Sequence, residues 1–251
     1  MGNSTPIFEH PELDDNSFYF DGNHIGVLLI HGFTATTVEV RWLANYLHDK
    51  GLTVSAPLLP GHGTTPQDMN KKKYSDWLDC VKEAYISLSE QCTTVIVGGE
   101  SMGAVLSLYL AERFSEIKAL LLYSPAIKVS GLKYSKILKF FKPIIQKSNY
   151  DEIMSWQGYS VYPLFAANEF LLLQKLVFQE LNRVSQPILI FHGAYDKTID
   201  IDSSELIYSS VNSSTKIKQT MLESGHVMLL DKEFKLIAEQ TWNFIEGLKI
   251  L

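Results

Sequence analysis

Short apolar runs alternate with longer stretches of helical periodicity along most of the chain. The apolar runs are typical of buried strands and lie at residues 26–30, 53–56, 94–97, 119–123 and 187–191. The intervening stretches, such as the one from Thr37 to Gly51, place apolar side chains on one face of a helix. Neighbouring parallel strands need a long crossover, which a helix usually provides. The alternation therefore predicts an α/β fold, with a mostly parallel sheet covered by helices on both faces.

One long interval interrupts this alternation. Residues 127–186 carry no clear strand signal, and they are too many for a single crossover. We therefore expect a core formed by residues 1–126 and 187–251, with residues 127–186 inserted as a cap. The insertion is rich in aromatic side chains, which favours a lid over an apolar pocket. The alternative is a helical subdomain whose aromatic residues only pack against one another.

Charge and cysteine content exclude several classes of protein. The chain has 22 Lys and Arg against 28 Asp and Glu, a net charge of −6, which disfavours binding to nucleic acid. Cys80 and Cys92 are too few for a disulfide scaffold and match no zinc spacing, so we expect reduced thiols and no metal or cofactor. No signal peptide and no apolar run of membrane-spanning length is recognisable. We expect a cytoplasmic protein without stable membrane insertion.

Residues 99–103, Gly-Glu-Ser-Met-Gly, fit the pattern G-x-S-x-G between a predicted strand and a predicted helix. A turn this tight leaves no room for side chains at its flanking positions, and the two glycines provide that room. The hydroxyl of Ser101 would then stand above the carboxyl edge of the sheet, as a nucleophile requires. The alternative interpretation is a helix-capping serine between incidental glycines. Glu100, inside the motif, is assigned no role.

A serine hydroxyl is a weak nucleophile, so it needs a base and a third group that orients the base. Only two histidines follow the motif, His192 and His226. Residues 216–222 alternate like an edge or half-buried strand and form the last predicted strand. His226 follows this strand and is the predicted base, whereas His192 lies at the end of the strand at 187–191 and is expected to be structural. The acid should follow the penultimate strand. Asp196 does so and is the predicted acid, with Asp200 and Asp202 as alternatives.

Acyl transfer also requires two backbone N–H donors for the negative oxygen that develops during the reaction. The residue after the nucleophile, Met102, is predicted to supply one. Phe33, in the loop after the first strong strand, is predicted to supply the other, because Gly32 lets that backbone approach closely. His31, beside it, is accompanied by no cluster of metal-ligating residues.

Five short motifs follow one another in an order that resembles the α/β-hydrolase superfamily, specifically small bacterial carboxylesterases and monoacylglycerol lipases: HGF (31–33), PGHGT (60–64), GESMG (99–103), GAYD (193–196) and SGH (224–226). The resemblance covers roughly residues 26–248. It implies an α/β-hydrolase fold with a small inserted cap. It also implies a serine hydrolase with these functional residues: Ser101, Asp196 and His226 as catalytic triad, Phe33 and Met102 as oxyanion donors.

The activity expected from this set of residues is the hydrolysis of carboxylic esters with short to medium acyl chains, through an acyl-serine intermediate. The expected partner is a small ester with an apolar acyl group. A monoacylglycerol lipase is the main alternative. An acyltransferase and a non-catalytic ligand-binding protein with the same fold are the weaker alternatives, because fold alone does not decide function.

Overall fold

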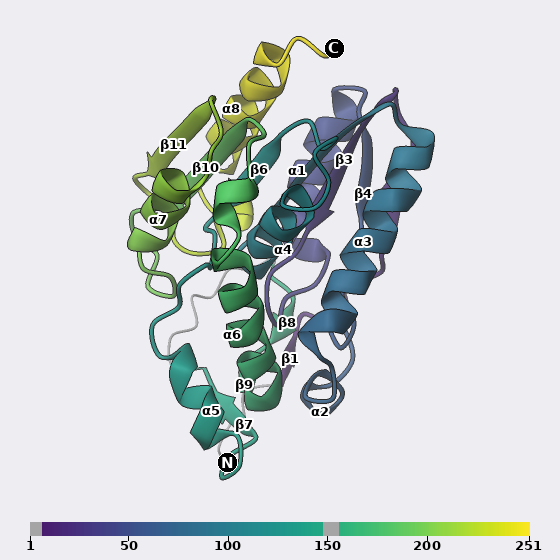
Figure 1. Ribbon diagram of the computed structural model, residues 1–251. Coiled ribbons are helices and arrows are strands. Elements are labelled where there is room, and N and C mark those ends of the chain that lie inside the picture. The colour runs from purple at the N-terminus through teal and green to yellow at the C-terminus, as the bar shows by residue number, and fades with distance from the viewer. Residues whose placement is uncertain (1–6, 148–155) are drawn as a thin grey trace.

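A seven-stranded sheet forms the centre of the computed structural model, which describes residues 7–147 and 156–251 (Figure 1). Its strands, in spatial order, are β11 (Lys216–Met221), β10 (Ile188–Gly193), β6 (Leu120–Tyr123), β5 (Thr94–Glu100), β3 (Ile25–Ile30), β4 (Thr53–Ala56) and β2 (Phe18–Phe20). All neighbours are parallel except β2, which pairs antiparallel with β4 at one edge. The predicted mostly parallel sheet is thereby confirmed.

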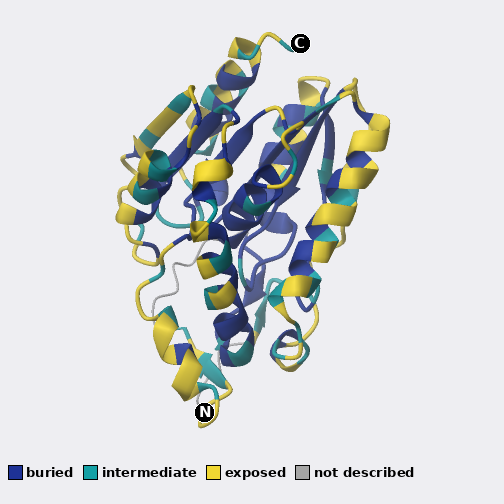
Figure 2. Ribbon diagram, viewed as in Figure 1, coloured by how far each residue is buried: buried dark blue, intermediate teal, exposed yellow. Residues whose placement is uncertain are grey.

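Helices cover both faces of this sheet. On one face lie α1 (Val38–Asp49) and α8 (Phe234–Gly247), and on the other α3 (Tyr74–Gln91), α4 (Met102–Ala111) and α7 (Asp202–Ser210). Alternate residues of β3 point into the two apolar layers, so that Val27 packs with α1 while Leu28 packs with α3. The central strands are accordingly buried throughout, as Figure 2 shows. Burial on both faces explains why these strands are unbroken apolar runs in the sequence.

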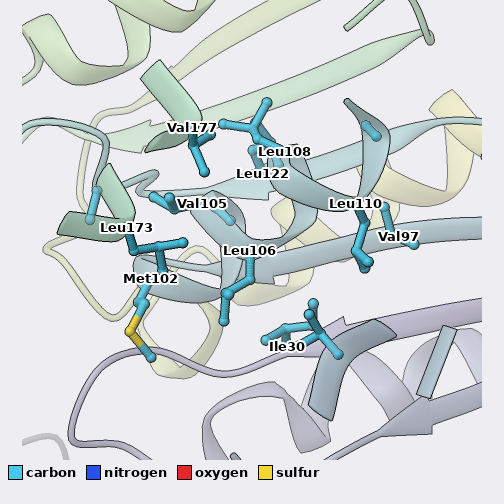
Figure 3. Packing of buried hydrophobic residues seen from close by; sticks show 14 of the residues in the cluster. Ile30, Val97, Met102, Val105, Leu106, Leu108, Leu110, Leu122, Leu173 and Val177 are labelled. Carbon is cyan, nitrogen blue, oxygen red and sulfur yellow. The ribbon is translucent and has the colours of Figure 1, made fainter. Parts of the chain in front are cut away.

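Helix α4 lies in the middle of the larger apolar layer. Figure 3 shows its side chains between the sheet and α6 (Leu164–Phe178), where Leu106 and Leu108 lie among residues of β3, β5 and β6, and Leu173 and Val177 come from α6. Nine of the ten residues of α4 are buried, and a helix that is apolar all round has to be enclosed in this way. The start of α4, which follows Ser101, is therefore held rigidly against the sheet.

The inserted residues hold more strand than the sequence predicts. They form α5 (Ser135–Leu138), β7 (Ile144–Gln146), β8 (Gly158–Tyr159), β9 (Val161–Pro163) and α6, with single 3₁₀ turns at Leu132–Tyr134 and Leu181–Arg183. Strand β7 pairs with β9, and β8 pairs with β1 (Phe8–Glu9). The expectation of no strand is wrong, because strands of two or three residues give no periodic signal. Residues 148–155 of the predicted cap lie outside the described residues.

Hydrogen bonds attach the insertion to the loops at the carboxyl edge of the sheet. The amide of Tyr159 donates to the carbonyl of Thr34 at 2.8 Å, and its hydroxyl donates to the carbonyl of Gly61 at 2.9 Å. Both loops, together with the short helix α2 (Pro66–Met69) and the 3₁₀ turn at Met228–Leu230, lie at this edge.

No helix in the described ranges is long and apolar enough to cross a bilayer.

Candidate active site

Ser101 occupies the sharp turn between β5 and α4. Its φ of +56° is a conformation that residues other than glycine rarely adopt. A Cβ on Gly103 or on Gly99 would overlap the carbonyl oxygen of Ile30 on the neighbouring strand. The helix and the strand can therefore approach each other only because both flanking residues are glycines. This close approach produces the strained turn that holds the serine hydroxyl above the sheet edge.

The structure brings the three predicted side chains together. Nε2 of His226 lies 3.0 Å from Oγ of Ser101, and Nδ1 lies 2.8 Å from Oδ2 of Asp196. The three residues come from the carboxyl ends of β5 and β10 and from the loop after β11, which meet at one edge because these strands are parallel. An ionised Asp196 requires the proton on Nδ1, so that Nε2 is free to accept the proton of the serine hydroxyl.

The surroundings of Asp196 keep its carboxylate ionised. Burial alone would raise its pKa, but the imidazole of His226 and the amides of Ile199 and Thr198 outweigh burial, and the pKa is lowered. Both amides donate to Oδ1 at 2.8 Å, while Oδ2 faces His226. The carboxylate therefore has a fixed orientation, which in turn fixes the tautomer of the imidazole.

The loops that carry the predicted acid, Asp196, and the predicted base, His226, pack directly against each other. A Cβ on Gly193 would overlap the carbonyl oxygen of Gly225, and the amide of Tyr195 donates to the carbonyl of Ser224 at 3.0 Å. The amide of Gly225 in turn donates to the carboxylate of Asp231 at 2.7 Å. The glycine of the GAYD motif thus permits the loop contact that places His226 beside Asp196.

The alternative residues make none of the hydrogen bonds that join Ser101, His226 and Asp196. His192 is buried 3.7 Å from Asp196, and neither of its ring nitrogens has a hydrogen-bond partner in the part of the chain that the structure describes. Burial lowers its pKa, which favours a neutral ring. The carboxylate of Asp200 accepts the amide of Asp202 at 3.2 Å, and its backbone carbonyl accepts the amide of Ser203 at 2.8 Å, both at the start of α7. The structure does not bring Asp200 or Asp202 to His226.

The two amides predicted as oxyanion donors lie in the loop after β3 and at the start of α4. Within residues 7–147 and 156–251, neither the N–H of Phe33 nor the N–H of Met102 donates a hydrogen bond. The loop that holds Phe33 is fixed by Glu39, whose Oε2 accepts from the amide of Gly32 at 2.5 Å. Phe33 lines a cavity beside Ser101, whereas the side chain of Met102 is buried in the core.

This cavity has a volume of about 390 Å³ and lies between the core and the insertion. Ser101 and His226 form part of its wall. The remaining wall is mainly apolar and includes Leu132, Leu138, Ile145, Leu164 and Phe170. The volume falls in the range of small-molecule sites, and the wall suits an apolar ligand group.

One part of the wall is polar, and the sequence did not indicate it. The ammonium group of Lys147 donates to Oγ1 of Thr34 at 2.7 Å and lies 4.6 Å from the centre of the Trp156 ring. Burial lowers the pKa of Lys147 to about 7, although the carboxylates of Glu39 and Glu9 oppose this shift. The indole N–H of Trp156 donates to Oε1 of Glu39 at 3.3 Å. No motif marks these residues, which converge only in the folded chain.

His31 is a structural residue of the neighbouring loop. Its Nε2 accepts the amide proton of Leu59 at 3.1 Å, and its ring lies against that of His62 with 4.8 Å between centroids. Burial lowers the pKa of His31 to about 4, so the ring is neutral. Among the described residues, no three His, Cys, Asp or Glu side chains are grouped so as to hold a metal ion.

Glu100 is a buried carboxyl beside Ser101, the predicted nucleophile. Its Oε1 accepts the amide of Leu229 at 3.3 Å, and its Oε2 is buried with no hydrogen-bond partner among the described residues. Burial, and next the nearby carboxyl of Glu39, raise the pKa of Glu100 well above its usual value. The folded protein therefore favours the protonated form of this side chain.

This shift predicts how stability depends on pH. Because the folded state holds a proton that the unfolded state releases above its usual pKa, the free energy of unfolding falls as pH rises from about 4.5. We expect Glu100→Gln to remove this loss, so that the variant gains about 1–3 kcal/mol over the wild type at pH 8 and almost nothing at pH 5. Urea denaturation of both proteins at pH 5 and pH 8 measures this difference in the free energy of unfolding. A gain that is equal at both pH values would contradict this explanation.

Comparison with known proteins places the chain in a family. A profile of the serine aminopeptidase S33 family matches residues 23–157. The chain is 30% identical over 231 residues to a thermostable monoacylglycerol lipase of Bacillus sp. (strain H-257), across 90% of this chain and 92% of that protein. It is 31% identical over 239 residues to a carboxylesterase of Bacillus subtilis (strain 168), across 92% of this chain and 96% of that one.

Solved structures agree with this placement. A structure described with LipS and LipT, two metagenome-derived lipolytic enzymes, matches with a TM-score of 0.89 and 29% identity over 93% of this chain and 98% of that chain. The monoacylglycerol lipase of Paleococcus ferrophilus shares the fold, with a TM-score of 0.77 and 17% identity over 94% of this chain and 98% of that chain. The chain therefore belongs to the serine aminopeptidase S33 family and is a serine hydrolase of the α/β-hydrolase superfamily.

Proposed function

We propose that this protein hydrolyses carboxylic esters with short to medium acyl chains through an acyl-serine intermediate. The observation that carries the proposal is the hydrogen-bonded series from Asp196 through His226 to Ser101, which ends at the wall of a largely apolar cavity. The similarity to a carboxylesterase and a monoacylglycerol lipase supports ester chemistry.

In the proposed mechanism, Oγ of Ser101 attacks the ester carbonyl while Nε2 of His226 takes its proton. Asp196 stabilises the resulting imidazolium, and the amides of Phe33 and Met102 bind the negative oxygen. His226 then donates the proton to the leaving alcohol, which departs and leaves the acyl group on the serine. Water attacks this acyl-serine with His226 again as base, which releases the acid and restores the hydroxyl.

We propose that residues 127–186 act as the cap of this site. Their described part contributes Leu132, Leu138, Ile145 and Phe170 to the cavity wall, which therefore consists of insertion and core together. Such a wall shields the acyl group from water and limits its length. The cavity volume of about 390 Å³ favours short to medium chains.

The polar part of the wall favours a second candidate function. Lys147 offers N–H donors to the cavity, and Glu39 lies on the same wall with Thr34. Donors and acceptors of this kind suit the hydroxyl groups of a glycerol leaving group, as in monoacylglycerol hydrolysis.

A substrate profile tests both candidates. With p-nitrophenyl esters of graded length, we expect the highest kcat/KM at acyl chains of about 4–10 carbons, because longer chains exceed the cavity. Release of glycerol from monoacylglycerols but not from diacylglycerols would favour the lipase. Folded protein that turns over no ester of any length would contradict the proposed function.

A further inference from the structure

The chain contains one strongly basic stretch, although it is acidic as a whole. Residues 127–147 hold six lysines and neither Asp nor Glu, in a chain of net charge −6. Four of these lysines recur at every third residue, at 133, 136, 139 and 142. Positive charge is therefore concentrated on one short segment around α5, which Figure 1 places at the end of the molecule opposite the C-terminus.

Large apolar side chains lie between these lysines and face outward. Phe140 is 71% exposed, Phe141 78% and Ile137 68%, and Tyr134 and Leu138 are exposed as well. Figure 2 shows this segment as largely exposed. We call residues 133–142, without the buried Ser135, the α5 surface. Contiguous apolar side chains on the outside of a soluble domain usually mark a binding surface.

The lysines of the α5 surface are not neutralised within the protein. In the described ranges, no carboxylate forms an ion pair with Lys133, Lys136, Lys139 or Lys142. Lys136 instead lies against Lys175 of α6, and their contact lowers the pKa of Lys175. Cations that gather without counter-charges attract an anionic partner from outside.

The α5 surface also adjoins the cavity. Tyr134 and Leu138 belong to the surface and line the cavity that reaches Ser101, together with the neighbouring Leu132 and Ser135. A partner that covers the α5 surface would therefore lie beside the candidate active site.

We propose that the α5 surface docks the protein reversibly on an anionic lipid surface. Exposed aromatic and aliphatic side chains enter the headgroup region, while the interleaved lysines pair with lipid phosphates; this combination is typical of segments that lie on a membrane. When the protein is docked in this way, the cavity opens towards the lipid, and an apolar ester can pass from the lipid to Ser101. This delivery step rests on the proposed ester hydrolysis, whereas docking itself does not.

Charge argues against a second copy of this chain as the partner. In a two-fold dimer the same patch meets itself, so that two lysine-rich surfaces would face each other. The phosphate groups of an anionic lipid are complementary to the lysines, and lipid chains also accept the apolar side chains between them. An anionic bilayer thus satisfies both halves of the α5 surface.

Co-sedimentation of the full-length protein with vesicles tests the proposal. We expect binding to phosphatidylcholine vesicles that contain about 30% phosphatidylglycerol, and at least about tenfold weaker binding to pure phosphatidylcholine. Raising the salt concentration from about 0.1 M to 0.5 M should weaken binding, because salt screens the attraction between the lysines and the lipid phosphates. Equal binding to both kinds of vesicle would overturn the proposal.

Two variants assign the binding to the α5 surface. We expect Lys133→Glu/Lys136→Glu/Lys142→Glu and, separately, Phe140→Ala/Phe141→Ala to bind anionic vesicles at least about tenfold more weakly than the wild type. The matched control reverses three exposed lysines elsewhere: Lys82, Lys118 and Lys235, each to Glu. If the control variant loses as much vesicle binding as the first variant, the loss reflects net charge alone and the assignment to the α5 surface is overturned.

Turnover of a soluble short-chain ester without vesicles separates this proposal from the proposed function. The substituted lysines and phenylalanines do not line the cavity, so all variants should keep wild-type turnover, which also shows that they fold. Inactive wild-type protein that still binds anionic vesicles would refute ester hydrolysis and leave docking intact. A dimer in solution that Phe140→Ala/Phe141→Ala abolishes would make a second copy the partner and overturn docking.

Discussion

Replacing Ser101 by alanine is expected to lower kcat for ester hydrolysis by about 10⁵–10⁶, and His226→Ala by a similar factor. In the proposed mechanism the two residues act as one unit, because the hydroxyl attacks only when Nε2, 3.0 Å away, takes its proton. The double variant should therefore be no slower than either single one. Single-turnover and steady-state rates on a p-nitrophenyl ester measure all three variants.

Labelling with a fluorophosphonate identifies the nucleophile independently of the substrate. We expect one label per chain in the wild type and none in Ser101→Ala. Ser130→Ala is the matched control, because Ser130 also lines the cavity, and it should keep the label. Label that persists in Ser101→Ala would exclude this residue as the nucleophile. A larger loss of kcat in His192→Ala than in His226→Ala would show that His192, not His226, is the base.

The core of the fold could be predicted because its sequence signals are local. The strand at 53–56 is found at the predicted residues, and the helix predicted from Thr37 to Gly51 spans Val38–Asp49. Gly51 ends that helix with a φ of +90°, which glycine adopts easily. Buried parallel strands and amphipathic helices each follow one period, so a single sequence is enough to locate them.

The contents of the insertion could not be predicted in the same way. Its strands are only two or three residues long, and β8 is completed by β1, which is far away in sequence. The polar wall of the cavity depends on the same long-range packing, since Lys147 reaches Thr34 across 113 positions. Nothing local distinguishes this lysine from the others in residues 127–147. Its contacts with Thr34 and Trp156 arise only when the chain folds.

The residues around the serine were predictable because each sits at a strand end. In a parallel sheet the carboxyl ends of the strands share one edge, so Ser101, Asp196 and the loop with His226 had to lie near one another. Glu39 was not predictable, because its helix gives no reason for a carboxylate to turn inward. Its bond to the amide of Gly32 is visible only in three dimensions.

Asp196→Asn is expected to lower kcat by about 10⁴ while leaving the fold intact. The amide side chain has nearly the same shape as the carboxylate, but it carries no charge to stabilise the imidazolium. It can also donate a hydrogen bond to Nδ1 of His226, which would place the ring proton on Nε2. That tautomer cannot accept the proton of Ser101. Steady-state kinetics at neutral pH, with a thermal unfolding curve as folding control, measure the effect.

Asp200→Asn is the matched control for this prediction, because it makes the same chemical change four residues along the same connection. The carboxylate of Asp200 accepts the amide of Asp202 at the start of α7 and makes no hydrogen bond to His226, so its replacement should change kcat by less than about threefold. The two variants therefore separate the acid from its rival by more than three orders of magnitude. A larger loss in Asp200→Asn than in Asp196→Asn would mean that the loop rearranges during catalysis and that Asp200, not Asp196, orients the imidazole.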